Sequence, residues 1–181
     1  MLKKLMVCLL ILVTLCGCKN TNTRQLDEEK YNAYLANYQA ILDYEDKKTE
    51  SSHFNIQLVC NKLKDGNYRY DLIVDNPRVS MCDLMILMVE ENLSLVIDTS
   101  KMMPSVGIFE TESTNMLPNQ SATEKGYVKG VNLSLISSES TLRVGVLVAY
   151  SNMEKTTTTR EYFSLVASYE EAVEEETTEQ Q

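Results

Sequence analysis

The strongest constraint on the fold is a two-residue hydrophobic period that runs through most of the chain after Ser51. In the segment 53–61, Phe54, Ile56 and Leu58 alternate with polar residues. This alternation is the pattern of a strand with one buried face. Further strands are predicted at 68–74, 106–110, 125–137, 142–150 and 156–168, and the nearly all-apolar run 81–89 is predicted to be a central strand.

About seven strands with no helix between them favour a sandwich. A turn signal at 64–67 and a proline at 77 separate the first three segments, because proline cannot join a strand ladder. We therefore predict a mainly β protein, an immunoglobulin-like antiparallel β-sandwich of about seven strands over residues 51–168. A small antiparallel barrel is the alternative. The chain has no Trp, so the Cys and Trp core signature of antibody domains is absent and only the architecture is predicted.

A helical period precedes the strands. Apolar residues recur there at three- and four-residue steps, namely Tyr31, Tyr34, Leu35, Tyr38, Ile41 and Leu42. We predict one amphipathic helix over about 25–46, in a segment 25–50 that leads into the sandwich. Its stripe must be buried, because an isolated helix of this length is marginal in water. The stripe either packs on the sandwich or contacts another protein through Tyr31, Tyr34 and Tyr38.

The first residues have the order of features found in a secretory signal. Lys3 and Lys4 precede an apolar run over 5–15, which is too short to span a bilayer. The run leads into Leu15-Cys16-Gly17-Cys18, and this segment resembles the lipobox of bacterial lipoproteins. The resemblance implies that residues 1–17 are a signal peptide and that Cys18 becomes a diacylglyceryl thioether. Two acyl chains such as palmitate would then anchor the protein stably to the cell membrane, on its extracytoplasmic face.

Three stretches of the body carry a second resemblance. The segments 68–77, 101–110 and 124–130 resemble small uncharacterised lipoproteins of Gram-positive, clostridia-like bacteria. Those proteins have a leading helix and a β-rich body, so the resemblance implies this fold over about 25–168. It implies no activity. The polar segment 18–24 is predicted to be a tether, and the acidic segment 169–181 a disordered tail.

Two cysteines follow the lipobox. Alternation turns Cys60 and Cys82 inward. An extracytoplasmic location permits a disulfide between them, and the alternative is two buried free thiols. Met102 and Met103, next to Pro104, are further candidates for a partner contact, because two large apolar side chains stand between predicted strands.

Composition excludes several functional classes. The formal net charge is -9, which argues against a nucleic-acid partner because phosphate contacts need clustered Lys and Arg. The single histidine, His53, argues against multi-His metal sites and most His-based catalysis. No Gly-x-Ser-x-Gly elbow or glycine-rich phosphate loop occurs. We therefore predict no catalytic residue, no cofactor and no metal ligand.

These observations predict a non-catalytic protein of the cell envelope. It would be anchored to the membrane through diacylglyceryl-Cys18 and would act as a binding or assembly module for another envelope protein. The alternative is a lipoprotein that captures a solute or a metal. In that case Asp75 and Asn76 could offer oxygen atoms to Ca²⁺, and the methionines could offer thioethers to Cu⁺.

Overall fold

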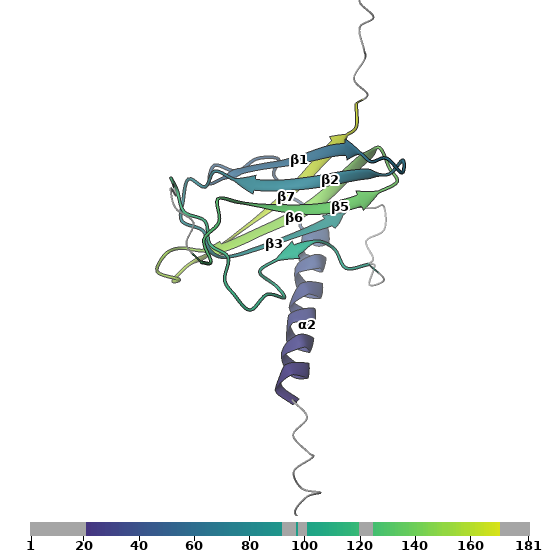
Figure 1. Cartoon of the computed structure of the whole chain (residues 1–181). Coiled ribbons are helices and arrows are strands. Elements are labelled where there is room, and N and C mark those ends of the chain that lie inside the picture. Colours follow the sequence, from purple (N-terminus) through teal and green to yellow (C-terminus); the bar gives the residue numbers. More distant parts are fainter. Residues whose placement is uncertain (1–20, 92–96, 98–100, 120–124, 171–181) are drawn as a thin grey trace, which may run out of the picture.

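The computed structural model describes residues 21–91, 97, 101–119 and 125–170. This part of the chain is mainly β and contains two antiparallel sheets and one helix, α2 (Thr21–Asp43) (Figure 1). The two sheets face each other, and α2 covers the outer side of one of them. The prediction of a mainly β, sandwich-like protein with a leading helix is confirmed at this level.

The first sheet has the strand order β1-β2-β5 and the second the order β4-β3-β6-β7. The first contains β1 (Asn55–Lys62), β2 (Tyr68–Asp75) and β5 (Gly130–Ser137). The second contains β3 (Cys82–Glu90), β4 (Ser105–Val106), β6 (Thr141–Ser151) and β7 (Thr158–Ser168). The chain crosses between the sheets after β2, β4 and β5, so only the β1–β2, β3–β4 and β6–β7 pairs are sequence neighbours.

The core lies between the sheets, as the alternation predicts. On β2 the inward residues Tyr70, Leu72 and Val74 are fully buried, and on β6 Val144, Val146 and Val148 are too. Phe54 and Phe163 close one edge of this core, with their ring centroids 5.8 Å apart.

The second sheet also needs cover on its outer side, because its central strands β3 and β6 are buried along almost their whole length. Helix α2 supplies that cover. Ile41 is fully buried, and a Cβ at Gly145 would lie 2.6 Å from its Cγ2 atom. The Tyr44 ring stacks on Tyr162 at 4.2 Å. Glycine at 145 is therefore what allows the helix to approach β6.

Several boundaries differ from the predicted ones. Helix α2 begins at Thr21 and ends at Asp43, so its first turn occupies part of the predicted tether. The predicted strand at 106–110 is wrong: β4 ends at Val106. Gly107 has a φ of 77° there, and a Cβ would overlap the carbonyl oxygen of Leu84. Strand β5 begins only at Gly130, after a turn at Gly126, whose φ is 81°.

Both ends of the chain carry predictions that lie outside the described residues. These are the signal peptide 1–17, the lipidation site Cys18, and most of the predicted acidic tail. The first residue of that tail, Tyr169, still contacts the sandwich. Its main-chain N–H donates to the carbonyl of Ser140 at 2.8 Å, and its ring lies 5.7 Å from that of Tyr68.

Candidate functional site

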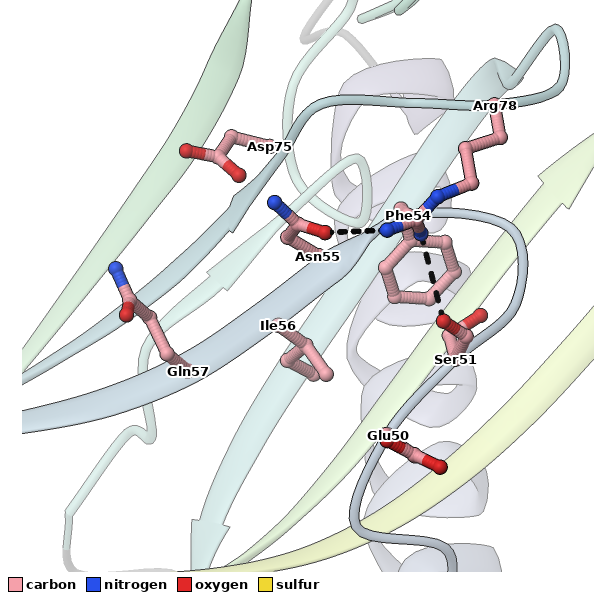
Figure 2. A pocket seen from close by; sticks show the side chains of 8 residues that line it. All are labelled: Glu50, Ser51, Phe54, Asn55, Ile56, Gln57, Asp75 and Arg78. Atoms are coloured by element: carbon pink, nitrogen blue, oxygen red, sulfur yellow. Dashed lines mark hydrogen bonds between the residues drawn. The ribbon is translucent and has the colours of Figure 1, made fainter.

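A surface hollow of about 340 Å³ opens at one end of the first sheet. The segment before β1, the first half of β1, the end of β2 and Arg78 form its walls. Figure 2 shows its lining residues: Glu50, Ser51, Phe54, Asn55, Ile56, Gln57, Asp75 and Arg78. Phe54 is buried and Ile56 half-buried, so the hollow has an apolar floor and a polar rim.

Arg78 fixes the rim of this hollow. Its Nη2 donates to Asn55 Oδ1 at 2.7 Å, and its main-chain N–H donates to the carbonyl of His53 at 2.6 Å. By contrast, the side chains of Glu50, Gln57 and Asp75 have no hydrogen-bond or ion-pair partner in the part of the chain that the structure describes. Their polar groups remain available to a ligand.

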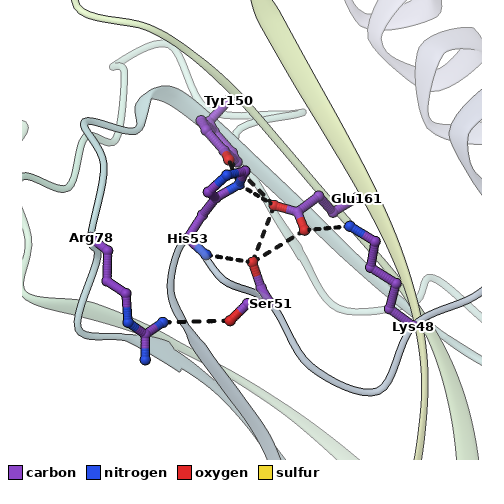
Figure 3. A network of polar contacts seen from close by, with 6 residues as sticks. All are labelled: Lys48, Ser51, His53, Arg78, Tyr150 and Glu161. Carbon is purple, nitrogen blue, oxygen red and sulfur yellow. Dashed lines mark hydrogen bonds and ion pairs between the residues drawn. The ribbon is translucent and has the colours of Figure 1, made fainter.

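A buried carboxylate lies next to the hollow and shares Ser51 with it (Figure 3). Glu161, on the inner face of β7, is only 4% exposed. Its Oε2 atom accepts from Lys48 Nζ and from Ser51 Oγ, each at 3.1 Å. Its Oε1 atom lies 2.9 Å from His53 Nδ1 and accepts from the Tyr150 hydroxyl at 3.3 Å. The same Nδ1 atom also lies 2.7 Å from the Tyr150 hydroxyl oxygen, so the side chains of His53, Tyr150 and Glu161 are in mutual contact.

The main chain brings these side chains together. Residue 48 pairs in parallel with β7: its N–H donates to the Tyr162 carbonyl at 2.8 Å, and its carbonyl accepts from Ser164 at 2.9 Å. The connection from α2 to β1 therefore runs along β7 before it enters the first sheet. Lys48, Ser51 and His53 are carried on that connection, directly over Glu161.

The network also sets the charge states. Burial alone would raise the pKa of Glu161, but hydrogen bonds from His53, Lys48 and Ser51, with the charge of Lys48, outweigh burial and hold this pKa below its ordinary value. Burial, followed by the charge of Glu161, raises the pKa of Tyr150 to about 12. At neutral pH Glu161 is thus an anion and Tyr150 a neutral donor.

This geometry suits a network that holds residues 48–53 on β7 better than a catalytic site with a serine nucleophile. The Ser51 hydroxyl is directed to Glu161, and its oxygen accepts from the His53 main-chain N–H at 3.0 Å. A serine nucleophile would instead donate to an imidazole nitrogen. Among the described residues, no group of three or more His, Cys, Asp or Glu side chains could hold a metal ion.

The structure corrects part of the predicted contact surface. Tyr34 and Tyr38 are 2% and 5% exposed, and Met103 is 6% exposed, so the prediction of a partner contact is wrong for these three residues. Tyr34 instead accepts a hydrogen bond from the main-chain N–H of Met103 at 2.9 Å. The stripe of α2 packs on the sandwich, which was the other interpretation of the helical pattern.

The other two predicted contact residues keep accessible surface. Met102 is 51% exposed, Tyr31 is half-buried, and Phe109, which the sequence did not single out, is 37% exposed. The Tyr34 ring centroid lies 6.2 Å from that of Tyr31 and 5.7 Å from that of Phe109, and Met102 precedes Met103, whose main-chain N–H donates to the Tyr34 hydroxyl. We call Tyr31, Met102 and Phe109 the helix-side patch.

Cys60 and Cys82 are free thiols, so the disulfide that the sequence allowed is not formed. Cys60 lies opposite Tyr70, close to the β1–β2 turn. Cys82 begins β3, which follows the opposite end of β2. The strand length therefore separates them. Burial raises the pKa of the Cys82 thiol, and the neighbouring Asp83 adds to the effect.

Sequence reasoning missed Glu161 and the residues around it. One signal was present, because Glu161 shares the inward phase of β7 with Phe163 and Leu165. An acid at an inward position needs buried partners. The partners of Glu161 could not be predicted, since Lys48 and Ser51 lie in a segment whose apolar residues follow neither a helical nor a strand period.

No family model, curated protein or solved structure matches this chain. In the described ranges, no helix has the length and apolar character to cross a membrane.

Proposed function

We propose that the protein is a lipid-anchored module on the extracytoplasmic face of the cell membrane, where it binds another protein of the envelope without catalysis. The observation that carries the anchor is the lipobox-like segment 15–18, preceded by two lysines and an apolar run. This order of features resembles bacterial lipoproteins, and the resemblance implies a diacylglyceryl group on Cys18. The anchor holds the module to the membrane by two acyl chains.

The position of α2 supports this proposal. The helix begins at Thr21, three residues after Cys18, and has 23 residues, so it is about 34 Å long. Among residues 27–43, whose burial the structure describes, Tyr34 is the first that is buried, and the N-terminal half of the helix extends away from the sheets (Figure 1). Helix α2 would therefore act as a spacer that holds the sandwich off the lipid surface. The net charge of -9 favours the same separation from an anionic surface.

The helix-side patch is the contact surface of the proposal. It combines two aromatic rings and a methionine where α2 meets the sandwich. Aromatic residues and Met are enriched at protein interfaces, and a well-packed ring such as Tyr34 beneath them gives the patch a rigid support.

The finer fold assignment belongs to the same proposal. We assign the body to the immunoglobulin-like sandwiches of about seven strands. The strand orders β1-β2-β5 and β4-β3-β6-β7 support it, because they match an A-B-E sheet packed on a C-F-G sheet with one extra edge strand. Such sandwiches are common in cell-surface domains.

The test is an in-cell crosslink of the intact protein on its native membrane, with partners identified by mass spectrometry. We expect one dominant envelope protein, and Met102→Asp should lower its recovery several-fold. Met153→Asp is the matched control, because Met153 is also 51% exposed but lies in the β6–β7 hairpin. Equal recovery from both variants would remove the helix-side patch from the proposal.

The anchor has its own test. Cys18→Ala should release the protein from the membrane fraction and abolish its acyl mass. Retention in the membrane with unchanged mass would refute the lipid anchor while leaving the partner contact open to the crosslink.

One observation favours a second function, the capture of a small polar solute in the hollow. Glu50, Gln57 and Asp75 present unpaired polar groups beside a fixed Arg78. If the protein captures a solute, a polar ligand found by screening should raise the temperature at which the protein unfolds, and Asp75→Ala should abolish that increase. A partner in the crosslink and no ligand in the screen would decide against it.

A further inference from the structure

The outer edge of β5 differs from the other sheet edges in the described part of the chain. β4 offers only two residues, and Gly107 turns the chain away directly after it. β7 is paired with residue 48 and carries Arg160 and Glu161. β1 lies against β7 and ends in Lys62. Short length, charge and cover are the usual protections of an edge strand.

Within the described residues, β5 has none of these protections. Its eight residues, GVNLSLIS, contain no charge and no proline. All eight pair with β2 in one unbroken register, so no bulge twists the edge away. Ile136 is 54% exposed, and none of the hydrogen bonds recorded for the described residues pairs the free edge of β5 with another segment. An edge of this length and composition is a template for another strand.

The two ends of β5 are fixed in position. Gly130 pairs with Asp75 at one end. At the other end the buried Tyr70 donates its hydroxyl hydrogen to the carbonyl of Glu139 at 2.6 Å. One residue before the strand stands Lys129, and two residues after it stands Glu139, both exposed. The edge is therefore a regularly paired, uncharged strand with one positive and one negative side chain beside its ends.

We propose that two copies of this chain pair through β5, antiparallel, about a two-fold axis at Ser134. In this register the numbers of two opposite residues add up to 268, because residue 134 of one copy lies opposite residue 134 of the other. Leu133 lies opposite Leu135 on the inner face, and Asn132 opposite Ile136 on the outer face. The alternation of faces is thus kept across the new pair.

The charged residues beside the two ends of β5 favour this register over the neighbouring ones. Lys129 of each copy lies opposite Glu139 of the other, so the symmetry creates two ion pairs at the ends of the strand. Axes at Leu133 or Leu135 would instead place Lys129 opposite Ser137 or Thr141. A chain with a net charge of -9 repels its own copies, and β5 itself carries no charged residue that would add to this repulsion. Such an interface is isologous and closed.

The first test is the mass of the full chain in detergent by sedimentation over a concentration series. The wild-type protein should dimerise. Lys129→Glu and Glu139→Lys should each weaken the dimer, on the order of tenfold, because each turns two attractive pairs into two repulsive ones. The double variant Lys129→Glu/Glu139→Lys should restore it. A monomer at every concentration, or a dimer that none of the variants changes, would overturn the proposal.

The second test locates the axis. Under mild oxidation Ser134→Cys should form a disulfide-linked dimer of the full chain, because residue 134 lies opposite itself. Asn132→Cys is the matched control, since it lies opposite Ile136, and the wild-type chain gives the background from its own thiols. Equal crosslinking of residues 132 and 134 would contradict the register.

Discussion

At the scale of single residues, Glu161 determines how the connection from α2 enters the first sheet. Four side chains from two segments, the α2–β1 connection and β6, converge on its carboxylate, and the group is almost wholly buried. A buried anion is tolerated only when it is paired and hydrogen-bonded. The network therefore makes the position of residues 48–53 depend on one carboxylate.

The first prediction is a loss of stability in Glu161→Gln. The amide has nearly the same size, but it carries no charge and only one of its two terminal atoms accepts hydrogen bonds, so it cannot replace the ion pair with Lys48. The side chains of Lys48 and His53 are 57% and 40% exposed, so water partly replaces the interactions that they lose. We therefore expect a loss of about 2 kcal/mol in the free energy of unfolding. Urea unfolding followed by circular dichroism measures it. Glu154→Gln, at an exposed hydrogen bond to Asn152, should change stability by less than about 0.5 kcal/mol, and equal midpoints for the two variants would contradict the role of Glu161.

The second prediction concerns acid. The pKa of Glu161 is lower in the folded state than the ordinary value of 4.5, so its stabilising contribution is present above that value and is lost as the pH falls through the folded pKa. Wild-type stability should therefore fall more steeply than that of Glu161→Gln below about pH 5. Urea midpoints between neutral pH and about pH 3 give the two slopes. The stability of Glu161→Gln should still depend on pH to some extent, because hydrogen bonds from Ser113 and Lys155 also lower the pKa of Asp83. Parallel curves for the two proteins would show that Glu161 does not contribute to the pH dependence.

At the scale of elements, the alternation predicted where most strands lie but not what covers the second sheet. The β1–β2 turn was predicted and contains Gly66 with a φ of 89°. β3 and β6 are apolar on both faces, which indicates cover on both sides. The period alone could not say that α2 provides it. The end of β4 was missed because it depends on the contact between Gly107 and the carbonyl of Leu84.

The third prediction tests the docking of α2. Gly145→Ala places a Cβ against Ile41 and should destabilise the protein by about 1 to 3 kcal/mol. Ile41→Ala alone leaves a cavity and should cost about 2 to 4 kcal/mol. In the double variant the new methyl fills part of the space that Ile41 left, so the two losses should not add. Thermal and urea unfolding of the four proteins complete the cycle; strict additivity would mean that the two residues do not meet.

At the scale of the whole molecule, the sequence could not show which apolar side chains stay at the surface. Met102 and Met103 are adjacent and chemically identical, yet one is exposed and the other is buried against Tyr34. Tyr34 and Tyr38 looked suited to a partner and became part of the core. Packing between distant segments decides which apolar side chains are buried, and neither secondary-structure propensity nor the hydrophobic period predicts it.

The layered body, the projecting α2 and the lipobox-like start combine in one account, in which the sandwich stands away from a membrane and presents the helix-side patch. The account depends most on the anchor, because the anchor gives α2 its role as a spacer. The most direct measurement is the intact mass of the protein purified from membranes, with fragmentation of its N-terminal peptide. The account predicts residues 18–181 with a diacylglyceryl group on Cys18. A chain that retains residues 1–17, or a Cys18 that carries no lipid, would contradict it.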